Sequence, residues 1–165
     1  MNRLSAMFLL IITTSLATYY LPKLSELKSN TALRAEIMRT AKLVLPVVLV
    51  ACLIIYFLRD IVVAMFFSPD FFQMRDLFAF QMVGNFFKVA SFLLAYLFWA
   101  KGMTVAYIVS EFVFTAIYLG LTAVFVNAFG LGGTAYAYAA NYILFTGMLV
   151  IKFRSLLFLT KKEIE

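Results

Sequence analysis

The segment Leu77–Ala100, LFAFQMVGNFFKVASFLLAYLFWA, is an apolar stretch of 24 residues that carries one lysine, Lys88, near its middle. A helix rises about 1.5 Å per residue, so this segment can cross the roughly 30 Å hydrocarbon core of a bilayer with Lys88 near the midplane. Insertion scales put the cost of a lysine at that depth at about 2.5–3.5 kcal/mol. We therefore expect Lys88 to face protein or water rather than lipid, as a residue of a functional site does.

Two more polar side chains share a helix face with this lysine. Gln81 and Asn85 precede Lys88 by seven and three residues, spacings that place all three on one side of a helix. The helix is therefore predicted to carry one polar stripe, and we expect its residues to bind substrate.

The composition places the whole chain in a membrane. Hydrophobic residues make up 65% of the 165 residues and charged residues only 13%, too few to cover a soluble domain with polar surface. Long apolar runs without period-two alternation predict an all-α polytopic helix bundle rather than a β-barrel. The net charge of +6 reports membrane topology rather than nucleic-acid binding.

Five apolar spans can be drawn in this single bundle, at about 4–21, 43–67, 77–100, 103–127 and 134–151. The first also reads as a signal peptide, but that would send the cationic loop 22–42 across the membrane, against the positive-inside tendency. With the amino terminus outside instead, ten Lys and Arg residues, including those of the tail 152–165, fall on the cytoplasmic side and two on the outer side. This topology predicts a periplasmic amino terminus and a cytoplasmic carboxy terminus.

Two connecting segments have patterns of their own. Leu33, Ile37 and Met38 share one side of ALRAEIMRTAK, which predicts a short amphipathic helix on the membrane surface before Pro46. The glycines of NAFGLGGT at 130–133 predict a tight outer turn.

Three further charges lie in apolar surroundings. Arg59 and Asp60, late in the second span, are expected to form a structural charge pair at the interface, with a transport role as the alternative. Glu111 lies deeper, and the tight turn at Lys101 would make its span an antiparallel neighbour of the Lys88 helix. Lys88 and Glu111 would then lie at similar depth, either as an ion pair that joins two helices or on the wall of a hydrated cavity.

Polar residues also share faces of the last two spans. Glu111 is followed on its face by Thr115, Tyr118 and Thr122, and the last span has Tyr138, Asn141 and Tyr142. The second group could contact sugars or form interhelical hydrogen bonds, while Ala135 and Ala139 would allow close helix approach. Without histidine, and with one cysteine and scattered carboxylates, the sequence predicts no metal, no cofactor and no enzyme.

Several motifs resemble one known family in order and spacing. YYLPKLSEL, AKLVLP, FLRD, MRDLFAFQMVGNFFKVA and the later Glu111 are similar to the carboxy-terminal part of Wzx-type O-antigen and enterobacterial common antigen flippases. These belong to the multidrug/oligosaccharidyl-lipid/polysaccharide exporter superfamily. The resemblance places the family lysine on Lys88 and the family glutamate on Glu111, whereas Asn85 stands where relatives carry aspartate.

The resemblance implies a function and a missing part. It implies twelve helices in two lobes in the bacterial inner membrane, moving an undecaprenyl-diphosphate-linked oligosaccharide to the periplasmic leaflet by alternating access. The lipid bilayer and the lipid-linked oligosaccharide would be its partners, and glycan polymerase machinery is a further candidate. Five spans are fewer than half of twelve, so the chain is expected to be a fragment that needs an amino-terminal lobe or a companion chain.

Two other functions stay open. A drug exporter of the same superfamily would favour buried acids over a lysine. A non-transporting membrane assembly subunit would use its buried charges only to pair helices.

Overall fold

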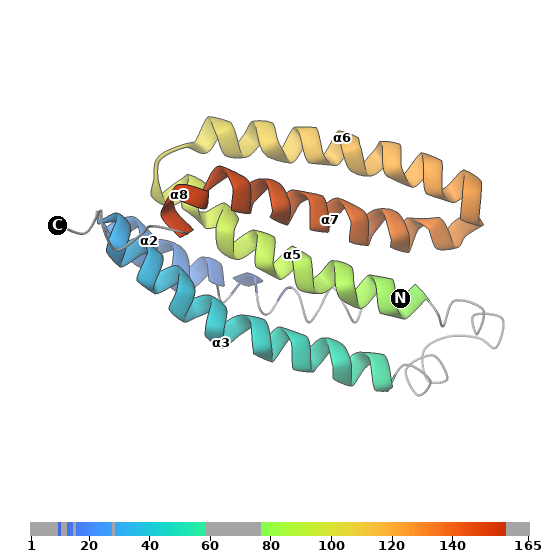
Figure 1. The fold of residues 1–165 in the computed structure, drawn as a ribbon, viewed down its shortest axis with the longest axis horizontal. Helices are drawn as coiled ribbons and strands as arrows, with labels where there is room; N and C mark the ends of the chain where they lie inside the picture. Colours follow the sequence, from blue (N-terminus) through green and yellow to red (C-terminus); the bar gives the residue numbers. More distant parts are fainter. Residues whose placement is uncertain (1–9, 11–12, 15, 28, 59–76, 158–165) are drawn as a thin grey trace.

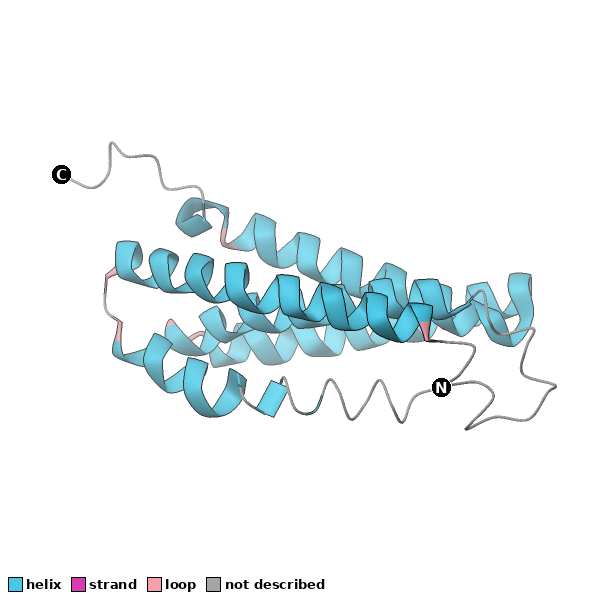
Figure 2. Ribbon diagram, turned by 90° about the horizontal axis from the view of Figure 1, so that it is seen from below, coloured by secondary structure: helices cyan, strands magenta, loops and turns pink. Residues whose placement is uncertain are grey.

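The computed structural model describes residues 10, 13–14, 16–27, 29–58 and 77–157. These residues form helices joined by short turns and contain no strand, which confirms the predicted all-α class (Figure 2). In chain order the elements are η1 (Leu16–Tyr20), α2 (Leu21–Glu26), α3 (Asn30–Phe57), α5 (Leu77–Ala100), α6 (Thr104–Phe129), η3 (Gly130–Gly132), α7 (Gly133–Lys152) and α8 (Arg154–Leu157). Arg59 and Asp60 lie outside the described residues, as do parts of the predicted spans 4–21 and 43–67.

Within the described residues, three segments are long and apolar enough to cross a membrane by length and composition: Asn30–Phe57, Leu77–Ala100 and Thr104–Lys152. The third reverses direction at η3, so α6 and α7 run antiparallel (Figure 1). Gly130 adopts a φ of 64° in this turn, a conformation that glycine reaches without steric cost. The chain is therefore a multi-pass membrane helix bundle.

The central helices are α5 and α7. α7 packs closely against both α5 and α6, whereas α5 and α6 contact each other only slightly (Figure 1). The sequence led us to expect α5 and α6 as direct neighbours, and this expectation is wrong in that α7 lies between them. Small residues explain the difference, because Ala135 and Ala139 are buried and let the α7 backbone approach α5 closely.

α3 begins earlier in the chain than the sequence suggested. It runs without a break from Asn30 through Pro46 to Phe57, so the predicted short surface helix before Pro46 is wrong. Proline removes one backbone hydrogen bond to the carbonyl four residues earlier, but it does not force a helix to end. Leu33 and Ile37 are buried in the hydrophobic core.

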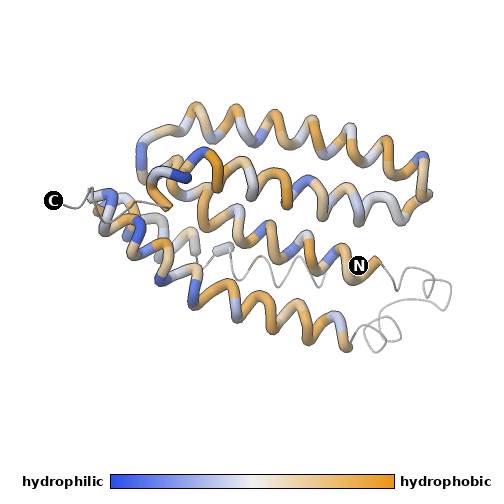
Figure 3. Tube along the Cα trace, in the orientation of Figure 1, coloured by the Kyte–Doolittle hydropathy of each residue, from blue (hydrophilic) through white to orange (hydrophobic). Residues whose placement is uncertain are grey.

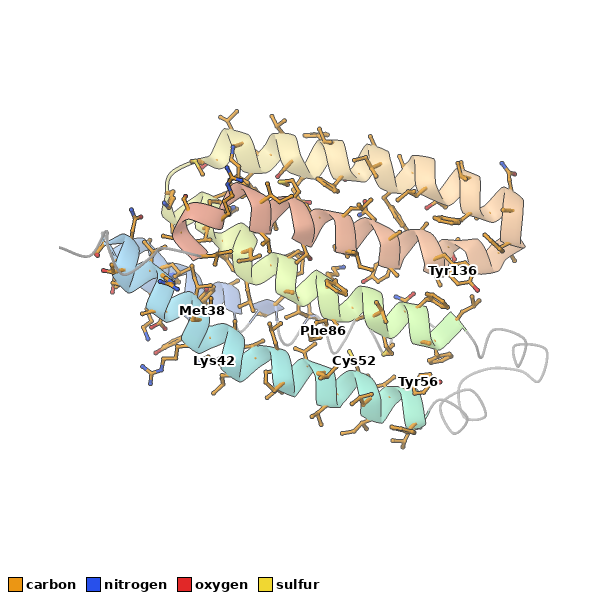
Figure 4. All side chains as sticks on the ribbon, in the orientation of Figure 1. Met38, Lys42, Cys52, Tyr56, Phe86 and Tyr136 are labelled. Carbon is orange, nitrogen blue, oxygen red and sulfur yellow. The ribbon has the colours of Figure 1, made fainter. Side chains whose placement is uncertain are left out.

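α3 meets α5 along an apolar interface. Cys52 and Phe86 lie along this interface, where they line a groove of about 280 Å³ together with Met82 (Figure 4). α5 therefore has an apolar face toward α3 and a different face toward α7.

Hydrophilic residues gather at the end of the bundle that contains the α5–α6 turn, which we call the basic end (Figure 3). Lys101 in this turn donates a hydrogen bond to Asn30 Oδ1 at the start of α3, at 3.2 Å. Lys23 of α2 forms a 2.8 Å salt bridge with Glu36 of α3, and this hydrogen bond raises the pKa of Lys23. The polar contacts at this end thus tie α2, α3 and the α5–α6 turn together.

Candidate functional site

A cavity of about 250 Å³ opens between α5, α6 and α7, at the level of the middle of α5. It is lined by both charged and aromatic side chains. The lining residues are Lys88, Phe92, Glu111, Phe114, Thr115, Tyr118, Tyr138, Asn141, Tyr142 and Phe145. Four of the predicted site residues, Lys88, Glu111, Tyr138 and Asn141, are therefore brought to one cavity.

Aromatic rings surround the Lys88 ammonium. Its Nζ lies 5.3 Å from the ring centre of Tyr142, 5.8 Å from that of Tyr138 and 5.9 Å from that of Phe92. A cation within about 6 Å of a ring face gains roughly 0.5–2 kcal/mol, more where water is excluded. We call these three rings the aromatic cage, and it stabilises a positive charge that the surrounding apolar helices do not.

Glu111 enters the same cavity from α6. The carboxylate interacts electrostatically with Lys88, and Tyr107 lies one turn earlier on the same helix. Glu111 and Lys88 form no salt bridge within 4 Å in the described part of the chain. Of the two readings that the sequence left open, this geometry matches the shared cavity wall, with the two charges apart.

Asn85 and Gln81 are placed differently from Lys88. Asn85 is fully buried and accepts a 3.0 Å hydrogen bond from the Tyr138 hydroxyl through Oδ1, so it lies in the α5–α7 interface rather than on the cavity wall. Gln81 is partly buried and does not line the cavity either. The polar stripe of α5 is therefore divided between the cavity and a helix interface.

The polar side chains of α7 have two kinds of surroundings. Tyr138 makes the interhelical hydrogen bond that the sequence allowed for. Asn141 is 7% exposed and lines the cavity, and its Oδ1 has no hydrogen-bond partner in the structure. The cavity thus offers an ammonium, a carboxylate and hydroxyl groups, which suit an anionic group and the hydroxyls of a sugar.

The sequence reasoning missed some of these residues. Phe92 follows Lys88 by four residues, so helical spacing could have identified it as part of the same face. Phe114 and Phe145 gave no signal, because they resemble the many other phenylalanines of an apolar helix. In the described residues, no group of three or more His, Cys, Asp and Glu side chains could hold a metal ion.

The fold and the cavity define a multi-pass all-α membrane protein with a charged, aromatic-lined cavity between its helices. The chain is similar to the Lipid III flippase of Escherichia coli (strain K12), with 35% identity over 144 residues, which are 87% of this chain and 35% of that protein. It matches the Lipid III flippase of Shigella flexneri with the same identity and coverage. The chain thus spans about a third of the length of these curated relatives. No protein-family model and no solved structure matches it.

Proposed function

We propose that this chain forms part of a flippase for lipid-linked oligosaccharides and that its cavity binds the anionic and sugar portion of the substrate. The observation that carries the proposal is the Lys88 ammonium, held in the cavity by aromatic rings and not engaged in a direct salt bridge. A positive charge in this position attracts a diphosphate or an acidic sugar strongly, because water screens it little. The similarity to Lipid III flippases supports the same class of substrate.

The other polar groups of the cavity suit the sugars. Asn141 has an unpartnered amide oxygen, and Thr115 and Tyr118 bring hydroxyl groups from α6. A buried acceptor without a partner is costly, and a sugar hydroxyl that donates to it would remove that cost. We assign the lipid anchor of the substrate to the undecaprenyl-diphosphate class implied by the sequence resemblance.

Glu111 gives the site a means to couple binding to conformational change. When the cavity is empty, Glu111 is the anionic group that attracts Lys88, and a bound diphosphate would compete for the same ammonium. A ligand shifts a conformational equilibrium only by interacting differently with its two states. Competition between substrate and Glu111 would supply such a difference for alternating access.

The proposal places the chain in the bacterial inner membrane with the basic end in the cytoplasm. Lys23 of α2 and Lys101 of the α5–α6 turn lie there, and these cations support this orientation through the positive-inside tendency. In a transporter of the relatives' length, a second bundle would form the opposite wall of the site. We also propose glycan polymerase machinery as a partner of such a flippase.

The test is to replace the two cavity charges in a full-length, two-lobe transporter and to measure membrane abundance and surface glycan. Lys88→Ala should reach normal abundance but lower glycan export at least tenfold, and Lys88→Arg should keep part of the activity because it keeps the charge. Lys152→Ala is the matched control, since Lys152 is exposed at the end of α7.

Three results would contradict the proposal. Normal export from Lys88→Ala would show that the substrate does not bind at this site. Recovery of export when Glu111→Gln is added to Lys88→Ala would show that the two charges only stabilise helix packing, as in an assembly subunit. Transport of small cations that depends on Glu111 but not on Lys88 would identify a drug exporter instead.

A further inference from the structure

We propose that Gly84 and Asn85 are positioning residues that seat the Tyr138 ring, so that the aromatic cage holds the Lys88 ammonium in the cavity. The assignment of a ligand to that ammonium rests on the proposed function, but the seat itself rests on contacts within the chain. Gly84 and Asn85 together are called the Tyr138 seat below.

Gly84 supplies the space for the ring. A Cβ atom at Gly84 would collide with Cδ1 and Cε1 of the Tyr138 ring and would lie 3.3 Å from Cα of Ala139. The ring therefore fills the volume that any other residue at position 84 would occupy. α5 and α7 approach each other closely here, so a side chain at position 84 would have to displace the Tyr138 ring.

Asn85 fixes the far end of the same side chain. The Tyr138 hydroxyl donates to Asn85 Oδ1 at 3.0 Å, and Asn85 is completely buried. A buried amide oxygen needs a donor, so this hydrogen bond favours one position of the tyrosine side chain over the alternatives. Gly84 thus leaves the space that the Tyr138 ring fills, and Asn85 holds the hydroxyl of the same side chain.

The ring held in this way is part of the cage. The Tyr138 and Tyr142 rings meet edge to face with their centres 4.9 Å apart, and the Lys88 Nζ lies within 5.8 Å of both ring centres. Movement of Tyr138 would therefore remove one cage ring directly and leave Tyr142 without its neighbour.

The cage determines where the lysine charge lies. A long lysine side chain in an apolar helix tends to extend toward the nearest interface, where its ammonium is hydrated. Attraction to the ring faces opposes this movement and keeps the ammonium beside Glu111 and Asn141. Asn85 does not line the cavity, so it acts on the lysine through Tyr138.

The experiment measures the acylation rate of Lys88 by N-hydroxysuccinimide acetate in the full chain, purified in detergent, with Lys101 in the same molecule as reference. Mass spectrometry gives the ratio of the two rates. Tyr138→Phe removes only the hydroxyl, and Asn85→Leu removes its acceptor at similar volume. Both should raise the Lys88:Lys101 ratio at least threefold, because a loosened cage leaves the amine more mobile and more accessible.

Two comparisons make the result specific. The double variant Asn85→Leu/Tyr138→Phe should give the same ratio as either single variant, because all three lack the same hydrogen bond. The control is Thr146→Val, which removes a hydroxyl that lies 3.0 Å from the Phe87 carbonyl of α5 and 2.8 Å from the Tyr142 carbonyl of its own helix, without touching Tyr138. It should leave the ratio unchanged.

An unchanged or lower ratio in Tyr138→Phe overturns the proposal, whatever happens to thermal stability. A threefold rise in Thr146→Val overturns it as well, because general loosening of the α5–α7 contact would then explain the effect. The labelling requires no transport, so the seat is tested separately from the flippase. A raised ratio in a protein whose Lys88→Ala variant exports normally would support the seat and reject the proposed function.

Discussion

The contact between Gly84 and Tyr138 leads to a prediction that runs against ordinary helix propensity. Replacing glycine by alanine inside a helix usually stabilises a protein by roughly 0.5–1 kcal/mol. At Gly84 the added methyl group would overlap the Tyr138 ring, and the Ala139 backbone lies 3.3 Å away on the same side. We therefore expect Gly84→Ala to destabilise the bundle.

The size of the effect follows from what must move. Forcing an extra methyl group into a packed interface costs about 1–3 kcal/mol. Displacing the Tyr138 ring also withdraws its hydroxyl from the buried Asn85 oxygen, and leaving such a group unpaired costs about 1–3 kcal/mol. After the gain in helix propensity of roughly 0.5–1 kcal/mol, we expect a net loss of about 1–5 kcal/mol in the free energy of unfolding.

The assay is reversible unfolding in detergent micelles, with Gly147→Ala and Gly120→Ala as matched controls. Both control glycines lie inside helices, and a Cβ atom at either would meet nothing within 4 Å. They should be neutral or more stable by up to about 1 kcal/mol. In a Tyr138→Leu background the cost of Gly84→Ala should shrink, because the ring is no longer present to be displaced.

If Gly84→Ala is as stable as Gly147→Ala, the ring does not occupy the space beside Gly84. The α5–α7 packing described above, and the seat inferred from it, would then be refuted together. If the cost of Gly84→Ala persists in the Tyr138→Leu background, the strain lies between the two backbones, at Ala139, rather than at the ring.

Two further predictions concern topology and the α6–α7 turn. The topology is tested with single cysteines in a Cys52→Ala background. Leu131→Cys should react with an impermeant thiol reagent in intact cells, whereas Ser29→Cys should react only after permeabilisation. The reverse pattern would place the basic end outside. Gly133→Ala should lower the free energy of unfolding by more than about 2 kcal/mol, because its methyl group would strike the Phe125 carbonyl; an unfolding midpoint equal to that of Gly147→Ala would contradict this.

Helical periodicity explains how far the site could be predicted from the sequence. Lys88 was recognisable because a lysine in the middle of an apolar span needs a partner, and α5 ends at Ala100, where the apolar run does. Glu111, Tyr138 and Asn141 were recognisable because each belongs to a polar face of its own helix. A face that is polar in a lipid environment turns toward protein, so three such faces from α5, α6 and α7 meet at one cavity.

The division of the α5 stripe could not be predicted in this way. Residues three apart on a helix differ in direction by about 60°, which is enough to place Lys88 in the cavity and Asn85 in the α7 interface. Which of the two meets α7 depends on where α7 packs. That position depends on Gly84, Ala135 and Ala139, whose small size does not distinguish them in sequence from other small residues of membrane helices.

The manner in which Lys88 is held bears on how Glu111 should respond to mutation. A lysine inside an apolar bundle can reach the interface, pair directly with an acid or rest against aromatic rings. In a direct buried pair, removing the acid leaves an uncompensated charge and destabilises the protein by about 3–5 kcal/mol. Here the cage already surrounds the ammonium and Glu111 forms no salt bridge within 4 Å of it. Glu111→Gln should therefore leave membrane abundance unchanged while altering export, the combination that separates a cavity charge from a packing charge.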